Sequence, residues 1–198
     1  VKYIRDIYHH RKLLTLPHFA YIRISDGCNN HCSYCAIPSI RGNLQSVPMD
    51  ALIEEAEILA QKGVKELIVT AQDTTQYGVD IYGKPKLPEL LKKLHQIEGF
   101  EWIRLLYLHP AHISSDLIEI ISSLPKINKY FEIPLQHIND DILTSMNRHI
   151  SKKEIISILN QIREKIPEAV IRTTFIVGYP GETEKRFQEL KEFIEDFK

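Results

Sequence analysis

The chain has 198 residues, of which 43% are hydrophobic and 26% are charged, and its formal net charge at pH 7 is −1. This composition is typical of a globular protein with a large core. The balanced charge argues against a broad nucleic-acid-binding face, which requires clustered positive charge. No apolar run is long enough to span a membrane and no signal peptide opens the chain, so we expect a cytoplasmic protein without a membrane partner.

Residues 1–17 are predicted to be a linker that follows an amino-terminal domain outside this sequence, because Pro17 ends any regular element there. His9 and His10 are adjacent and would face apart, so we expect both at the surface. The chain lacks an initiating Met and ends inside an apparent helix. We therefore expect a piece of a longer protein, with one domain at residues 18–198.

From residue 19 onwards, β-type and helical segments alternate about five times. Strands are predicted at 19–24, 66–71, 102–108, 130–135 and 169–177. The helices between and after them are predicted at 50–62, around 87–94, from a cap at Ser114 or Ser115 to 121, after the capping box Ser151–Glu154, and under the stripe Phe187, Leu190, Ile194 and Phe197. This alternation predicts an α/β fold, in which a parallel sheet carries outer helices and is either doubly wound or closed toward a barrel. No Gly-x-Gly-x-x-Gly follows the first strand, which argues against a dinucleotide site.

All three cysteines lie in one stretch with the spacing Cys-x-x-x-Cys-x-x-Cys, at Cys28, Cys32 and Cys35. A short loop brings three thiolates to one metal centre at little entropic cost. Iron–sulfur clusters normally use four cysteines, so three would leave one iron open to a small molecule. Two other interpretations stay open: a disulfide with a spare thiol, and a zinc site of three Cys and one His in an interaction module without catalysis.

Polar residues lie at the predicted carboxyl ends of the strands, and βα barrels have their active sites at these ends. These polar residues are the cysteine stretch, Gln72-Asp73, His109, Gln136-His137 and residues 178–182. Strand alternation also points Glu132 and Arg172 into the barrel, where charges must be paired. We expect them to be buried there and to pair with each other or with Arg104.

The cysteine spacing resembles that of the radical S-adenosylmethionine superfamily. Residues 19–42, 133–136 and 172–183 resemble the methylthiotransferases within it, and residues 71–83 resemble the RimO branch. The tRNA-modifying MiaB branch usually has a Gly-Gln-Asn-Val-type segment where this chain has residues 71–74. The resemblance implies a partial βα barrel, left open because its sixth strand lies outside the sequence.

The resemblance implies a radical SAM core that helps to add a methylthio group to the β-carbon of an aspartate in a small-subunit ribosomal protein. The reaction begins with reductive cleavage of S-adenosylmethionine to a 5′-deoxyadenosyl radical. A tRNA adenosine methylthiotransferase is the alternative within the family. The family also implies an electron donor such as a flavodoxin or ferredoxin, a second [4Fe–4S] cluster in the missing amino-terminal domain, and a missing carboxyl-terminal substrate-binding domain.

The resemblance also implies roles for individual residues. Cys28, Cys32 and Cys35 would ligate a [4Fe–4S] cluster, whose fourth iron holds the amino and carboxylate groups of S-adenosylmethionine. The implied cofactor-binding residues are Gln72 for the methionine amino group, Gln136 and Arg148 for the ribose or the carboxylate, Thr174 for the ribose and adenine, and Tyr34 for the adenine. Plain loop packing is the alternative for Tyr34 and for Thr174.

Overall fold

The computed structural model describes residues 12–197. His9, His10 and most of the predicted linker lie outside these residues. Five parallel strands run through the described part: β1 (Phe19–Arg23), β4 (Glu66–Thr70), β5 (Trp102–Leu105), β6 (Tyr130–Glu132) and β7 (Val170–Arg172). They form one sheet in the order β1-β4-β5 and a separate pair β6-β7, so the predicted α/β class with parallel strands and no closed barrel is confirmed.

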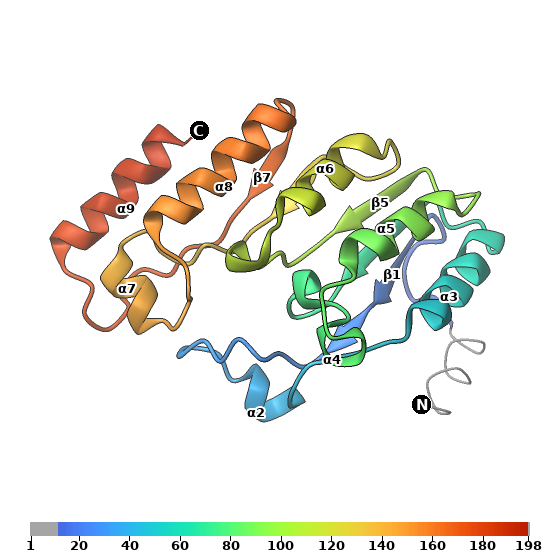
Figure 1. Ribbon diagram of the computed structural model, residues 1–198, viewed down its shortest axis with the longest axis horizontal. Coiled ribbons are helices and arrows are strands. Elements are labelled where there is room, and N and C mark those ends of the chain that lie inside the picture. Colours follow the sequence, from blue (N-terminus) through green and yellow to red (C-terminus); the bar gives the residue numbers. More distant parts are fainter. Residues whose placement is uncertain (1–11, 198) are drawn as a thin grey trace.

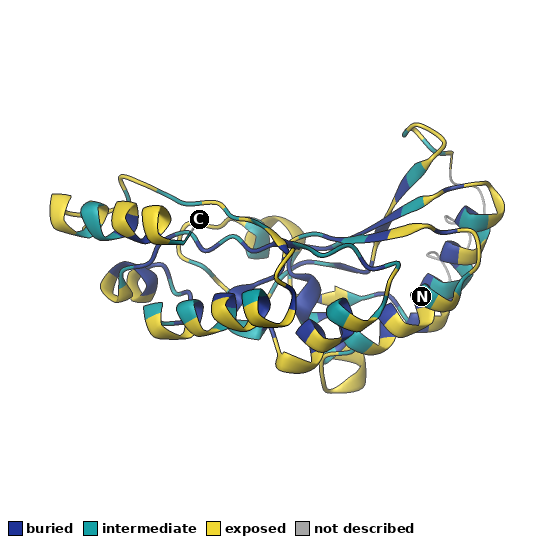
Figure 2. Cartoon of the chain, turned by 90° about the horizontal axis from the view of Figure 1, so that it is seen from above, coloured by how far each residue is buried: buried dark blue, intermediate teal, exposed yellow. Residues whose placement is uncertain are grey.

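Backbone hydrogen bonds connect the two sheets. The amide of Leu108 donates to the carbonyl of Glu132 over 2.9 Å, and the amide of Asn128 donates to the carbonyl of Ile103, also over 2.9 Å. The strands therefore continue from one sheet to the next without a full ladder between β5 and β6. Figure 2 shows the strands along one side of the molecule and most helices on the other.

The strands are connected by helices, as the alternation predicts. The longer helices are α3 (Met49–Gln61), α5 (Leu87–Gln96), α6 (Ser115–Ser123), α8 (Lys152–Lys165) and α9 (Glu184–Asp196). The shorter elements are β2 (Ser25–Asp26), α2 (Ile37–Arg41), β3 (Gln45–Ser46), α4 (Val79–Tyr82), α7 (Asp140–Ser145) and the 3-10 turns Thr74–Gln76 and Pro110–His112. Ser114 caps α6, and the predicted capping box at the start of α8 is present. Figure 1 shows these elements in chain order.

The core lies between the sheet and the helices. Ile22 of β1, Leu67 of β4 and Phe131 of β6 are fully buried there. Helix α5 contributes to the same core an apolar face whose four leucines are all buried: Leu87, Leu90, Leu91 and Leu94. Burial of this face stabilises the fold by roughly 1.5–3 kcal/mol for each leucine. Among the described residues, no helix combines the length and the apolar character that crossing a bilayer requires.

Three predicted strands are shorter than the sequence indicates. β5 ends at Leu105 and β6 at Glu132, and β7 ends at Arg172 with one isolated bridge beyond it, between Gln136 and Phe175. The chain turns left-handed at Tyr107, with φ +59°, and at Gln136, with φ +72°. Neither residue is a glycine, so the local sequence does not signal these turns.

The predicted apolar stripe of the last helix is partly wrong. Leu190 is buried, but Phe187 and Ile194 are 36% and 44% exposed. Phe193, outside the predicted stripe, is buried instead and contacts Phe175 and Phe197. Helix α9 lies at one end of the molecule (Figure 1), and only Leu190 and Phe193 are buried among its residues, so two of its apolar side chains remain exposed.

The predicted ion pair between Glu132 and Arg172 is confirmed, with Arg172 Nη1 2.8 Å from Glu132 Oε1. The expectation that both charges are buried is wrong for Arg172, whose side chain is 63% exposed. The open barrel leaves this inner face uncovered. Arg104 pairs instead with Glu66, and its guanidinium lies 5.1 Å from the centre of the Tyr130 ring.

Candidate functional site

A cavity of about 300 Å³ lies at the carboxyl ends of the parallel strands. Its wall takes residues from the loop before α2, from the segments after β4, β5, β6 and β7, and from the connection between α7 and α8. All eight residues predicted for the site line it: Cys28, Cys32, Tyr34, Cys35, Gln72, Gln136, Arg148 and Thr174. The fold therefore brings the predicted residues to one place.

The cysteine loop, residues 28–35, joins β2 to α2. Gly27 precedes it with φ +71°, and a Cβ there would lie 2.2 Å from the carbonyl oxygen of Asn43, so this turn requires glycine. The amide of Cys28 donates to the carbonyl of Gly42 over 3.2 Å. Within the loop, the amide of Cys35 donates to the carbonyl of Cys32 over 3.0 Å. These contacts hold the loop folded back on itself.

The three thiols are free, and none forms a disulfide. Burial raises the pKa of the Cys28 thiol above its usual value, so this group is protonated at neutral pH unless a metal displaces the proton. Arg148 Nη1 lies 3.6 Å from Cys32 Sγ. A positive charge at this distance offsets the negative charge of a metal centre that is bound through sulfur.

The far end of the cysteine loop is bound to the second half of the molecule. The amide of Ser33 donates to the carbonyl of Met146 over 3.1 Å, and the Ser33 hydroxyl lies 2.7 Å from that of Tyr179. Asn147 Nδ2 donates to the carbonyl of His31 over 2.9 Å. In Figure 1 this loop extends from the region of α2 toward α7. The loop is therefore held at both ends.

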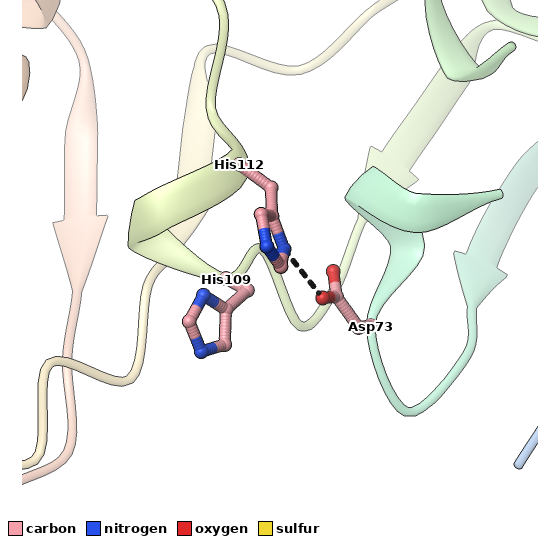
Figure 3. A group of neighbouring side chains, drawn as sticks. All are labelled: Asp73, His109 and His112. Carbon is pink, nitrogen blue, oxygen red and sulfur yellow. Dashed lines mark hydrogen bonds and ion pairs between the residues drawn. The ribbon is translucent and has the colours of Figure 1, made fainter. Parts of the chain in front are cut away.

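Asp73 fixes the middle of the cysteine loop. Its Oδ2 accepts a 2.8 Å hydrogen bond from Asn30 Nδ2 and lies 3.0 Å from His112 Nδ1 (Figure 3). Its Oδ1 accepts from the amide and the hydroxyl of Thr75. Burial alone would raise the pKa of Asp73, but the hydrogen bonds from His112, Thr75 and Asn30 hold it below its usual value. Asp73 is thus a charged anchor.

Asp73, His109 and His112 are also a group whose ligand atoms all lie within 4.8 Å of one another. Both oxygens of the Asp73 carboxylate already have two partners, which leaves a metal ion little to bind. Among the described residues, the three thiols do not form such a close group. A single tetrahedral zinc ion would hold its sulfur ligands about 3.8 Å apart. At least one pair of these sulfurs is therefore more than 4.8 Å apart, which suits a cluster better than one ion.

Two polar residues at the strand ends do not reach the cavity. His137 is fully buried, and its Nε2 lies 2.9 Å from Glu182 Oε1. His137 Nδ1 accepts a hydrogen bond from the amide of Asn139 at the start of α7. This pair connects the segment after β6 to the turn before α9, so we assign it a structural role.

The cavity also contains residues that the sequence did not assign to it. His109, Glu132 and Tyr107 are part of its wall. Strand alternation predicted that Glu132 points into the barrel, and His109 was predicted at a strand end. No motif gave either residue a role. Tyr107 enters the wall through its left-handed backbone, for which the sequence holds no signal.

The strand order and the strand-end cavity place the molecule among α/β proteins with an open βα barrel. The chain belongs to the Radical SAM superfamily, whose family model matches residues 22–194. Membership of this superfamily implies a [4Fe–4S] cluster and S-adenosylmethionine as the groups that such a cavity holds.

Curated relatives share about half of its residues. The chain is 51% identical over 188 residues to the ribosomal protein uS12 methylthiotransferase RimO of Clostridium tetani, and 53% identical over 188 residues to that of Clostridium botulinum. Each match covers 95% of this chain and 42% of the relative, so the chain spans less than half of their length.

A solved structure shares the fold at low identity. The radical S-adenosylmethionine methyltransferase TsrM from Kitasatospora setae, with tryptophan and a cofactor analogue bound, matches with a TM-score of 0.72 and 14% identity. The match covers 91% of this chain and 34% of that protein. At this identity the likeness concerns the fold alone.

The residues present fit the implied groups. Four buried atoms on the cavity wall have no hydrogen-bond partner within the described residues: Gln72 Oε1, His109 Nε2, Glu132 Oε2 and Arg148 Nε. Buried polar atoms are rarely left unpaired, so such a set marks a place for a polar guest. S-adenosylmethionine offers an ammonium and two hydroxyls as donors and a carboxylate as an acceptor. Three free thiols on the same wall suit three irons of a cluster.

Proposed function

We propose that this chain is the radical SAM core of a methylthiotransferase that modifies the β-carbon of an aspartate in a small-subunit ribosomal protein. The observation that carries the chemistry is one cavity lined by three free thiols and by unpartnered buried polar atoms. The substrate class rests on the RimO relatives at about half identity. The tRNA-modifying and zinc-module interpretations have no comparable support.

The proposal includes the parts of the protein that this chain does not contain. Because the chain spans 42% of these relatives, residues 18–198 would be the core domain and residues 1–17 the linker from an amino-terminal domain. That domain would hold the second [4Fe–4S] cluster, and a carboxyl-terminal domain would bind the substrate. A flavodoxin or ferredoxin would supply electrons in the cytoplasm.

Each wall of the cavity has a task in this proposal. Cys28, Cys32 and Cys35 bind three irons, and Arg148 compensates the negative charge near Cys32. The bound cluster and S-adenosylmethionine supply a one-electron cleavage of a carbon–sulfur bond. The residues of this chain orient the cofactor and exclude water from it.

The remaining predicted residues position the cofactor in this proposal. Gln72 offers its unpartnered Oε1 as an acceptor for an N–H of the methionine amino group. Gln136 and Thr174 lie on neighbouring strand ends, where the amide of Gln136 donates to the carbonyl of Thr174 over 2.8 Å. Their side chains would border the ribose, and Tyr34 would lie against the adenine. A cofactor held at so many points presents one carbon to the substrate.

The test is anaerobic reconstitution of the full-length protein with iron and sulfide, followed by an assay for 5′-deoxyadenosine. We expect Cys32→Ala to abolish its formation, because the cluster loses one of its three protein ligands. Ser39→Ala, an exposed change in the adjacent α2, should leave formation unchanged. Undiminished cleavage in Cys32→Ala would refute the assignment.

The same preparation tests the substrate. With recombinant ribosomal protein uS12 we expect a mass increase of one methylthio group on an aspartate, and with tRNA we expect none. Modification of tRNA alone would contradict the proposed protein substrate but would still be consistent with the proposed radical chemistry.

A further inference from the structure

His109 lies on the cavity wall and is not among the residues assigned above. Its side chain follows β5 and is 7% exposed. Its Nδ1 accepts a hydrogen bond from the amide of Ala111 over 3.3 Å, which leaves the ring proton on Nε2 when the ring is neutral. Nε2 is buried and has no partner within the described residues. His109 therefore offers one unused N–H donor.

The environment of His109 keeps the ring neutral and in place. Burial, followed by the positive charge of Arg148, lowers the pKa of His109 to about 3. The ring stacks on that of His112, with centroids 4.7 Å apart, and His112 is held by Asp73 (Figure 3). The donor thus comes from a side chain whose ring is held by the Ala111 amide and by the His112 ring.

Arg148 presents a second unused donor to the same cavity. Its Nη2 donates to the carbonyl of Pro134 and its Nη1 lies near Cys32, but its buried Nε has no partner in the described residues. The neutral His109 N–H and the Arg148 guanidinium N–H together offer two hydrogen-bond donors and one positive charge, and neither group is an acceptor. A single carboxylate, with two oxygens and one negative charge, matches this pair in number and in charge.

We propose that His109 donates a hydrogen bond from Nε2 to the carboxylate of S-adenosylmethionine, beside Arg148. This inference rests on the proposed function and adds a positioning residue to it. S-adenosylmethionine has one carboxylate, so the contact fixes which end of the cofactor lies against the segment after β5. The ribose and adenine then extend toward Gln136 and Thr174.

The test measures equilibrium binding of S-adenosylmethionine to the full-length, cluster-loaded, oxidised protein, so that no turnover is involved. The variants His109→Gln and His109→Met have side chains of nearly equal size, and only glutamine retains an N–H donor. Hydrogen bonds to charged groups are strong enough that we expect Met to bind at least about tenfold more weakly than Gln. Iron and sulfide content should be equal in both.

A second probe identifies the group that His109 contacts. Decarboxylated S-adenosylmethionine lacks the carboxylate, so the difference between the Gln and Met variants should vanish with it. His95→Met, the same type of change on α5 away from the cavity, should not alter either affinity. The two-by-two comparison isolates the carboxylate contact from any general loosening of the wall.

The outcomes separate this inference from the proposed function. Equal affinities of the Gln and Met variants for S-adenosylmethionine would overturn it, as would a difference that persists with the decarboxylated probe. Failure of the unsubstituted, cluster-loaded protein to bind S-adenosylmethionine at all would overturn the proposed function instead.

Discussion

Asp73 joins three segments that are distant in the sequence. It contacts Asn30 in the cysteine loop, Thr75 in its own turn, and His112 after β5. A buried carboxylate with four donors is stabilised in its charged form, and each donor is in turn fixed by it. The position of the cysteine loop over the cavity therefore depends on the charge of one side chain.

We predict that Asp73→Asn destabilises the protein by about 1–3 kcal/mol, because an amide hydrogen replaces an acceptor that faces Asn30 and His112. The free energy of unfolding in urea measures this. Iron should also be lost faster to a chelator, since the loop is less firmly held. Asp50→Asn, at an exposed position in the first turn of α3, is the control and should change neither quantity. Unchanged iron retention in Asp73→Asn would contradict the anchoring role.

At the scale of elements, helix α9 is held by polar contacts as much as by its apolar face. Glu189 accepts a 2.7 Å hydrogen bond from Lys152 at the start of α8, and another 2.7 Å bond from Asn139, which caps α7. One carboxylate thus links three helices. The Lys152 and Asn139 hydrogen bonds lower the pKa of Glu189 below its usual value of 4.5.

We predict that Glu189→Gln lowers the free energy of unfolding at neutral pH. A carboxyl group with a lowered folded-state pKa stabilises the protein above its unfolded pKa, and this stabilisation is lost as the pH falls through the folded-state value. The difference between the unsubstituted chain and Glu189→Gln should therefore be constant from pH 7 to about 5 and shrink below about 4.5. Urea unfolding at several pH values checks this. Glu192→Gln, on the exposed side of α9, should show no such pH-dependent difference.

The sequence predicted the elements wherever a local pattern specifies them. The five parallel strands follow from β-type runs, and Ser151 with Glu154 marked the start of α8. Strand ends were too long where the backbone becomes left-handed at Tyr107 and Gln136. Such a conformation costs roughly 1–2 kcal/mol outside glycine and is imposed by tertiary contacts, which no window of sequence contains.

The site was predictable to the extent that its residues lie in motifs. The spacing of the three cysteines marked them as metal ligands, the five residues expected to bind the cofactor came from the family resemblance, and all eight line the cavity. His137 and Glu182 carried the same strand-end signal yet pair with each other elsewhere. His109 had that signal too, but only its unpartnered Nε2 distinguishes it. Whether a buried polar atom has a hydrogen-bond partner can be determined only from the three-dimensional structure.

At the scale of the whole molecule, the strands differ in the number of neighbours. Among residues 12–197, β4 pairs with β1 and with β5, whereas β7 pairs only with β6. Residues of β4 are largely buried, and Val170 of β7 is 59% exposed. The sheet that contains β4 is therefore paired on both sides of this strand and well buried, whereas β7 is an exposed edge strand.

Hydrogen exchange of this chain should reproduce that difference. We predict that the amides of Leu67, Ile68 and Val69 exchange most slowly among the strands, because opening them breaks both ladders of the first sheet. The amides of β7 should exchange fastest, as one pairing and little burial protect them. Equal protection of β4 and β7, measured by mass spectrometry of matched peptides, would contradict the description of two unequal sheets.

The residues that line the cavity range from Cys28 to Thr174, while its three sulfur donors lie close together at residues 28–35. During synthesis these thiols leave the ribosome before Arg148 and Thr174, which complete their enclosure. A cluster delivered to the nascent thiols would stand exposed to water and oxygen. A cluster that is inserted after the last strand has packed would enter a folded cavity that shields it from solvent. We therefore expect cluster insertion to follow folding in this architecture.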